Sequence, residues 1–221
     1  MLHVALTFDV EHPDRPTDVG VTDRILEALA LADVRATMFV QGRWAQAYPE
    51  TARAIARAGH LIGNHSHFHA RMPMFTRRGL SSDVLCATAA IRDVTGVDPR
   101  PWFRSPFGAI DRGTQVLDGL ARLGYRNVGW HVDSRDWASR GPAGLAIRVV
   151  AGVLEHGDGA VVLMHGWPRP TPLALPDLIA ALRDEGAHFA TIDQLPQLPT
   201  RAAWDTASRD VEGRRPGGAE A

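Results

Sequence analysis

Three histidines stand within five residues in the segment HSHFH, at His65, His67 and His69. Two imidazoles spaced by four residues share one face of a helical turn, and two spaced by two residues share one face of a strand. Either backbone could therefore present a metal-binding pair. Histidine pairs completed by a carboxylate suit Zn²⁺ used in hydrolysis, or non-haem iron. Asp9 and Glu11, at the end of an apolar run near the N-terminus, could supply that carboxylate.

Further ionisable residues stand at the ends of later apolar runs, namely Arg104 in RSPFG, Asp133 and Asp136 in DSRDW, and His165 in LMHG. Taken singly, each has a plainer interpretation as a surface cation, a helix cap, a loop acceptor or a buried imidazole with a hydrogen-bond partner. In a βα barrel, however, the carboxyl ends of the strands meet at one face, where reactive groups gather. The common position of these residues therefore favours one shared site.

The elements that would position these residues are short apolar strands alternating with helices. Strands are expected at residues 3–10, 35–40, 60–66, 101–106, 125–133, 159–165 and 188–193. Helices are expected at residues 22–32, 44–58, 79–94, 111–123, 142–155 and 174–185. This alternation predicts an α/β protein with a mostly parallel sheet, closed or nearly closed into a barrel. A doubly wound open sheet is the alternative, and the lack of a Gly-x-Gly-x-x-Gly after the first strand weakens its nucleotide-binding form.

The length and composition predict one domain followed by a tail. A chain of 221 residues is long enough for one well-buried domain and short for two, and we expect that domain to span residues 1–196. Residues 197–221 lack apolar periodicity, so we expect a flexible C-terminal tail, which Trp204 could dock locally.

Charge, cysteine content and hydropathy restrict the classes of function. The formal net charge is −1, which disfavours nucleic acid as a partner. Cys86 is the only cysteine, so no intrachain disulfide can form and any metal must be held by nitrogen and oxygen ligands. The start MLHVALTFDV has neither a basic segment nor a small-residue cleavage site, and no run approaches the roughly 18 apolar residues that span a bilayer. These features predict a cytoplasmic protein without a membrane partner, and they leave the oligomeric state open.

Five motifs in order resemble those of the polysaccharide deacetylase family, also described as the NodB-homology domain or carbohydrate esterase family 4. They are TFDVE, HSHFH, RSPFG, DSRDW and LMHG, and the resemblance runs from about Leu2 to Leu195. It implies a distorted (β/α)7 barrel that holds a divalent metal. Zinc is the expected metal, and Co²⁺, Mn²⁺ and Ni²⁺ can share such a site.

The resemblance also implies the metal ligands. His65 and His69 match the two ligating histidines of the family, whereas the intervening His67 does not. The family's second aspartate, usually the third ligand, is replaced by Val10, and a subgroup with an Asp-x-acid arrangement makes Glu11 the candidate ligand. Alternation along a strand supports this assignment, because Asp9 and Glu11 would share one face while Val10 points away.

The remaining roles follow from the same resemblance. Asp9 matches the catalytic base, Arg104 the residue that pairs with it, and His165 the acid, which Asp136 orients. The substrate-binding positions are Phe107, whose backbone N–H would face the oxyanion, and Trp137 and Leu163, which would line a pocket for the acyl methyl. Asp133 receives no chemical step. Gly166 stands where the family often has aspartate, so one auxiliary substrate contact is in doubt.

The expected function is removal of an N-acetyl group from an amino sugar or related glycoconjugate, with a small-molecule or oligosaccharide substrate. The alternative within the same chemistry is hydrolysis of another acyl group, such as an O-acetyl ester, an N-formyl group or a cyclic amide as in the allantoinase-like branch. A non-catalytic carbohydrate- or metal-binding module is disfavoured, because the proton-transfer residues Asp9, Arg104, Asp136 and His165 all persist.

Overall fold

The computed structural model describes residues 1–14, 20–111 and 113–201. Its centre is an eight-stranded sheet with the order β5-β4-β3-β2-β1-β7-β6, and β8 pairs with the start of β1. The paired strands run parallel throughout these ranges. The strands are β1 (Leu2–Val10), β2 (Thr37–Val40), β3 (Leu61–Asn64), β4 (Trp102–Phe103), β5 (Arg126–Asn127), β6 (Val132–Asp133), β7 (Ala160–His165) and β8 (Ala187–Phe189).

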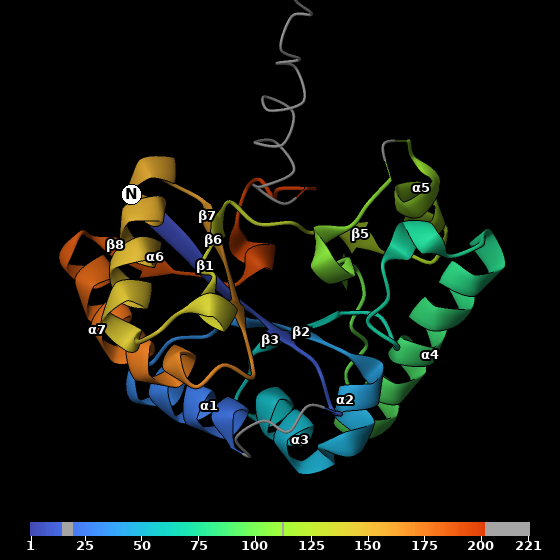
Figure 1. The fold of residues 1–221 in the computed structure, drawn as a ribbon, viewed down its shortest axis with the longest axis horizontal. Coiled ribbons are helices and arrows are strands. Elements are labelled where there is room, and N and C mark those ends of the chain that lie inside the picture. Colours follow the sequence, from blue (N-terminus) through green and yellow to red (C-terminus); the bar gives the residue numbers. More distant parts are fainter. Residues whose placement is uncertain (15–19, 112, 202–221) are drawn as a thin grey trace, which may run out of the picture.

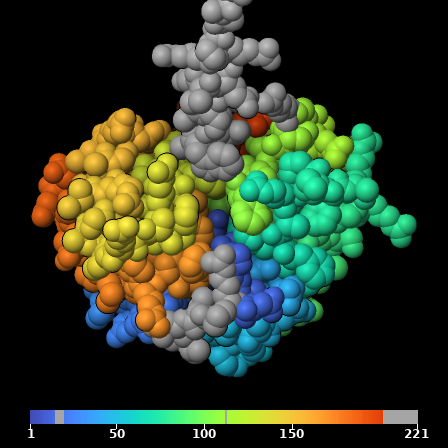
Figure 2. All heavy atoms as spheres, viewed as in Figure 1, coloured from blue at the N-terminus to red at the C-terminus, as the bar shows by residue number. Residues whose placement is uncertain are grey.

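Helices surround the sheet on its outer side, with α1 to α3 along one flank, α4 and α5 on a second, and α6 and α7 on a third (Figure 1). Parallel neighbours need such crossover connections. The helices are α1 (Val21–Leu31), α2 (Gly42–Ala47), α3 (Pro49–Arg57), α4 (Arg77–Thr95), α5 (Gln115–Arg122), α6 (Pro142–His156) and α7 (Pro170–Asp184). In the space-filling view, α6 and α7 (yellow to orange) and α4 (green) lie on opposite flanks of the molecule (Figure 2).

Alternation along β1 separates the outer core from the barrel interior. The side chains that pack against the helices are Val4, Leu6, Phe8 and Val10, all fully buried. The opposite face carries Ala5, which belongs to a smaller interior cluster with Trp130 and Leu163. Since successive side chains point to opposite faces, this inner face ends in Asp9, and the strand aims its acidic end into the barrel mouth.

The segment expected as one strand over 125–133 forms two short strands at opposite edges of the sheet. β5 pairs with β4, and β6 pairs with β7. Between them, the Val128 amide donates to the carbonyl of Phe103 and the His131 amide donates to that of Val161, so the segment crosses from one edge to the other. Within the described ranges no ladder joins β5 to β6. The expected α/β fold is confirmed. The sheet forms an incomplete barrel, and the segment between β5 and β6 crosses its open side without a strand ladder.

The helix expected over 44–58 is likewise divided, into α2 and α3. Pro49 has no backbone N–H and cannot continue a preceding helix, but it suits the first turn of a new one. Accordingly α2 ends at Ala47 and α3 begins at Pro49.

Residues at the start of the expected tail contact the crossing segment. The Gly129 amide donates to the Pro199 carbonyl, and the Asn127 side chain donates to that of Thr200. Residues 202–221, including Trp204 and its expected docking, lie outside the described residues. The division at residue 196 therefore stays a prediction.

Candidate active site

Glu11, His65 and His69 bring one donor atom each to within 4.8 Å of one another. Glu11 follows β1, and the two histidines follow β3. The His65 Nε2 atom lies 3.1 Å from Glu11 Oε2, which His69 Nε2 also contacts. These three residues, chosen from the sequence as metal ligands, thus form one cluster. His67 lies outside it.

The orientation of His65 points its Nε2 atom at Glu11. Its Nδ1 atom lies 2.9 Å from the backbone carbonyl of Arg104, which can only accept a hydrogen bond. Nδ1 therefore carries the proton, and Nε2 is free to bind a cation. Metal-binding histidines are typically held by such a hydrogen bond on the other ring nitrogen.

The loop between the two histidines is held by side chains that accept from its backbone. The His69 amide donates to Ser66 Oγ at 3.0 Å, and both of these residues have a positive φ. The buried Asp83 carboxylate of α4 accepts from the amides of His67 and Phe68, at 2.9 and 3.1 Å. These hydrogen bonds hold the loop in a conformation that places His69 close to His65.

Asp9 and Arg104 form a buried ion pair beside the cluster. Arg104 Nη1 donates to Asp9 Oδ1 at 3.0 Å and to the Thr7 hydroxyl at 2.8 Å, and the fully buried guanidinium also donates to the carbonyl of Gly129. The second carboxylate oxygen of Asp9 lies 3.5 Å from His65 Nε2. One oxygen of Asp9 is thus fixed by arginine while the other faces the cluster.

His165 and Asp136 form a second pair at the same end of the barrel, because His165 is the register partner of Asp9. Asp136 Oδ1 lies 2.7 Å from His165 Nδ1, and Asp136 Oδ2 accepts from the Thr171 hydroxyl at 2.7 Å. Burial disfavours the charged imidazole, but the charge and hydrogen bond of Asp136 outweigh it and raise the pKa of His165 to about 9. Asp133 lies next to this pair, and burial raises the pKa of its carboxyl.

The three positions expected to bind substrate differ in exposure. The Phe107 ring lies 4.6 Å from that of His69, centroid to centroid, and its backbone has a φ of 58°. Trp137 follows Asp136 and is 56% exposed, whereas Leu163 is buried in the interior cluster. All three stay predictions as substrate contacts, and Phe107 is the one that touches the metal-ligand cluster.

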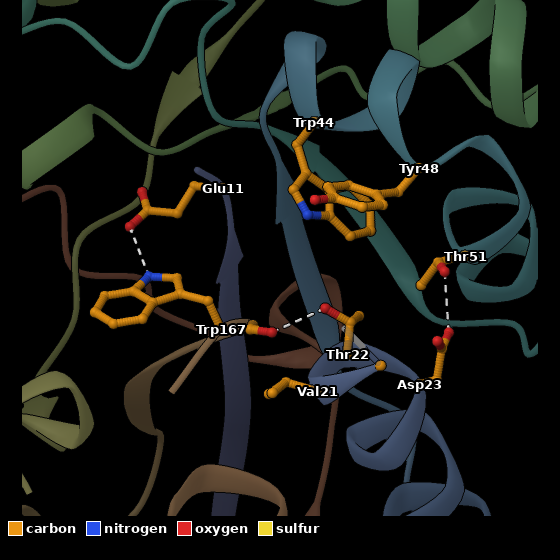
Figure 3. Close-up of a pocket in the computed structure, with 10 residues that line it drawn as sticks. Glu11, Val21, Thr22, Asp23, Trp44, Tyr48, Thr51 and Trp167 are labelled. Carbon is orange, nitrogen blue, oxygen red and sulfur yellow. Dashed lines mark hydrogen bonds between the residues drawn. The ribbon is translucent and has the colours of Figure 1, made fainter. Parts of the chain in front are cut away.

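Two aromatic residues to which the sequence reasoning gave no role, His12 and Trp167, also hold Glu11. The Trp167 indole N–H donates to Glu11 Oε1 at 3.2 Å, and His12 Nε2 lies 2.8 Å from the same oxygen. Figure 3 shows Trp167 reaching Glu11 from the loop after β7, across a cavity of about 60 Å³ from Trp44 and Tyr48. The only sequence signal for Trp167 is its place two residues after His165.

The neighbouring imidazoles determine the charge of Glu11. Burial disfavours its carboxylate, but the contacts with His12, His65 and His69 hold its pKa well below the usual range. The carboxylate is therefore ionised at neutral pH, as a ligand must be.

An incomplete parallel barrel with histidines and carboxylates at the carboxyl ends of its strands defines a class of α/β proteins of the NodB type. Comparison with known families identifies it: the sequence profile described as "Polysaccharide deacetylase" matches residues 2–128. The chain belongs to the polysaccharide deacetylase family. The family expected from the motifs is thereby confirmed.

Individual relatives agree with the family. The peptidoglycan-N-acetylglucosamine deacetylase PgdA of Listeria monocytogenes is 32% identical over 192 residues, which are 87% of this chain and 38% of that protein. The chain thus spans well under half the length of this relative. A family 4 carbohydrate esterase from Streptomyces lividans, solved with acetate, is 31% identical with a TM-score of 0.74, over 85% of this chain and 91% of that one.

The family also contains a protein described as a pseudoenzyme. A family 4 pseudoenzyme from Bacillus anthracis is 30% identical with a TM-score of 0.78, over 87% of this chain and 64% of that one. Fold alone therefore does not establish catalysis, and the argument for activity depends on the side chains at the barrel mouth.

No helix in the described ranges is both long and apolar enough to cross a membrane.

Proposed function

We propose that this chain is a metal-dependent deacetylase that hydrolyses the N-acetyl group of an amino sugar in an oligosaccharide or glycoconjugate. The observation that carries the proposal is the meeting of three groups at one end of the barrel. They are a three-ligand cluster, a carboxylate fixed by arginine and an imidazole backed by a carboxylate.

The donor set fits a divalent transition metal. Two imidazole nitrogens and one carboxylate oxygen, from His65, His69 and Glu11, suit Zn²⁺ with coordination positions left open. Zinc is our first choice, with Co²⁺, Mn²⁺ or Ni²⁺ as alternatives. When bound, such a metal lowers the pKa of a water molecule and polarises the acyl carbonyl.

In the proposed reaction Asp9 is the general base. Its Oδ2 atom faces the cluster, 3.5 Å from His65 Nε2, and it takes the proton of the attacking water as the C–O bond forms. Arg104 fixes the orientation of Asp9 through the 3.0 Å ion pair.

His165 is the general acid. With its pKa raised to about 9 it is protonated near neutral pH, so it can give its proton to the leaving nitrogen as the C–N bond breaks. Asp136 is the hydrogen-bond partner of Nδ1, so Nε2 is the ring nitrogen that gives the proton to the leaving nitrogen. Acetate and the free amine are the products.

The substrate positions complete the proposal. The backbone N–H of Phe107 would stabilise the oxyanion, and Trp137 and Leu163 would line the pocket for the acetyl methyl. Relatives named as acting on the N-acetylglucosamine and N-acetylmuramic acid of peptidoglycan make N-acetylated sugars of this kind the first substrates to test.

The direct test is acetate release by metal-stripped protein, with and without added Zn²⁺, from short N-acetylated oligosaccharides and from O-acetylated esters. We expect zinc-restored release from the amides. Asp9→Asn serves as the control for contaminating activity. A zinc-loaded protein that is silent on the amides but active on the esters, or silent on both, would contradict the proposal.

A further inference from the structure

The two oxygens of Glu11 face different partners. Oε2 is directed at the histidines of the cluster, whereas Oε1 accepts from Trp167 Nε1 at 3.2 Å and contacts His12 Nε2 at 2.8 Å. The carboxylate is therefore held from behind on one oxygen and presents the other to the metal-ligand cluster.

Such support matters because of where Glu11 lies. The last residue of β1 is Val10, whose side chain packs in the outer core, so Glu11 is the first residue beyond the strand ladder. A glutamate has one more rotatable bond than an aspartate and loses more conformational freedom when it is fixed. A ligand at this position therefore needs an external partner to hold its carboxylate in one orientation.

Trp167 has the chemistry and the anchorage for this task. An indole N–H can only donate, so it can bind the carboxylate but cannot itself bind a metal. The preceding Gly166 is fixed on both sides, since its amide donates to the Asp9 carbonyl at 2.8 Å and its carbonyl accepts from the Thr22 hydroxyl at 2.9 Å. The chain before Trp167 is thereby tied to β1 and to α1.

Close packing at Gly166 places the loop that carries Trp167 beside Val10, the residue that replaces the expected aspartate ligand. A Cβ at Gly166 would lie 3.2 Å from Thr22 Oγ1 and 3.4 Å from Val10 Cα. The loop after β7 thus lies directly over Val10, the position without a ligating side chain. This close approach of the backbone allows the indole of the next residue to reach Glu11.

We propose that Trp167 is a positioning residue for the metal site, which holds Oε1 of Glu11 so that Oε2 serves as the third ligand. The inference rests on the proposed function, because it presumes that Glu11 binds the metal. It adds a residue of this chain that makes a glutamate beyond the strand an effective replacement for the aspartate absent at Val10.

The test compares two substitutions of the same kind in one pocket. Trp167→Phe removes the indole N–H but keeps an aromatic ring. Trp44→Phe does the same to a tryptophan that lines the pocket and packs against Tyr48, and that makes no hydrogen bond to Glu11 in the described part of the chain (Figure 3). The affinity of each purified, metal-stripped protein for Zn²⁺ is measured by competition with a chromophoric chelator. Thermal melting of the metal-free proteins checks their folding.

We expect Trp167→Phe to bind Zn²⁺ about 10- to 100-fold more weakly, the loss typical of an outer hydrogen bond to a ligand, and Trp44→Phe to stay within about twofold of the wild type. In the Co²⁺-substituted proteins, the visible absorption bands should change for Trp167→Phe only, because they report the ligand geometry. This second measurement separates positioning from a general loss of packing.

Three outcomes would overturn the inference. Affinity of Trp167→Phe within about twofold of the wild type would show that the hydrogen bond does not matter. Equal losses in both variants would assign the effect to packing. A wild-type chain that binds no divalent metal would overturn the proposed function and the inference with it, and this outcome is distinguishable because it needs no variant.

Discussion

At the scale of single residues, the account depends most on Glu11. Its carboxylate contacts both histidines and is 5% exposed, whereas Val10, where the motif resemblance led us to expect a ligating aspartate, packs in the outer core. The site is therefore complete only if Glu11 acts as the third ligand.

Glu11→Ala should abolish or greatly weaken metal binding. Removal of a ligand leaves two imidazoles, so we expect a loss of more than about 100-fold in Zn²⁺ affinity, beyond the effect of losing an outer hydrogen bond. Metal content after dialysis against a zinc buffer measures this. His67→Ala is the matched control, because His67 lies outside the cluster. Full zinc occupancy in Glu11→Ala would refute the ligand assignment.

Asp9→Asn should separate metal binding from turnover. The amide is nearly the same size as the carboxylate but cannot take a proton from water, so we expect unchanged zinc content and a fall in kcat of about 10²- to 10⁴-fold. Acetate release and metal analysis on the same sample test both parts. A variant with near wild-type turnover would exclude Asp9 as the base.

The sequence could place the residues of the site at a common end of the barrel because their types and strand-end positions are local features. Asp9, Glu11, His65, His69, Arg104, Asp136 and His165 all lie at one end of the barrel. Trp167 and Asp83 could not be found in this way. Their roles come from the approach of the loop after β7 and of α4, which no local spacing encodes.

At the scale of elements, the junction between α3 and β3 makes a prediction about pH and stability. His60 stands in this junction, where its Nδ1 accepts the Ala36 amide at 3.1 Å. Burial, with the nearby charge of Arg35, lowers the pKa of His60 to about 4. Between this value and the ordinary pKa near 6.5, the unfolded chain binds more protons than the folded one, so stability falls as pH falls through that range.

His60→Asn should make stability less dependent on pH between about 6.5 and 4. The amide oxygen can still accept from Ala36 but does not titrate. The shift corresponds to at most about 3 kcal/mol of unfolding free energy in the wild type. Urea unfolding at several pH values measures the slope. Some slope should remain, since burial also lowers the pKa of His131 to about 4. An unchanged slope would contradict the assignment.

Helices and strands were predicted best where the sequence pattern is compatible with only one kind of secondary structure. The apolar run near the N-terminus was expected as a strand at residues 3–10, and β1 forms there with an outer and an inner face. The segment 125–133 is as apolar as a strand, but an extended chain that crosses the open side of the barrel buries the same residues. Only its partners, Phe103 on one side and Val161 on the other, show that it is divided.

At the scale of the whole molecule, metal binding should stabilise the fold, because the ligands come from segments that are far apart in the chain and meet only in the folded state. Zinc at 100 times its Kd would add about 2.7 kcal/mol, which corresponds to a rise in Tm of roughly 5–10 °C for a domain of this size. Thermal melts with and without Zn²⁺ test this, with Glu11→Ala as the control. An equal rise in that variant would place the zinc elsewhere.

The central claim is that Glu11, His65 and His69 form the metal site of a working deacetylase. It is tested most directly by anomalous diffraction at the zinc edge from crystals of the zinc-loaded protein. We predict one strong peak within bonding distance of Glu11 Oε2, His65 Nε2 and His69 Nε2. A peak that lies away from Glu11, or no peak at this end of the barrel, would contradict the account.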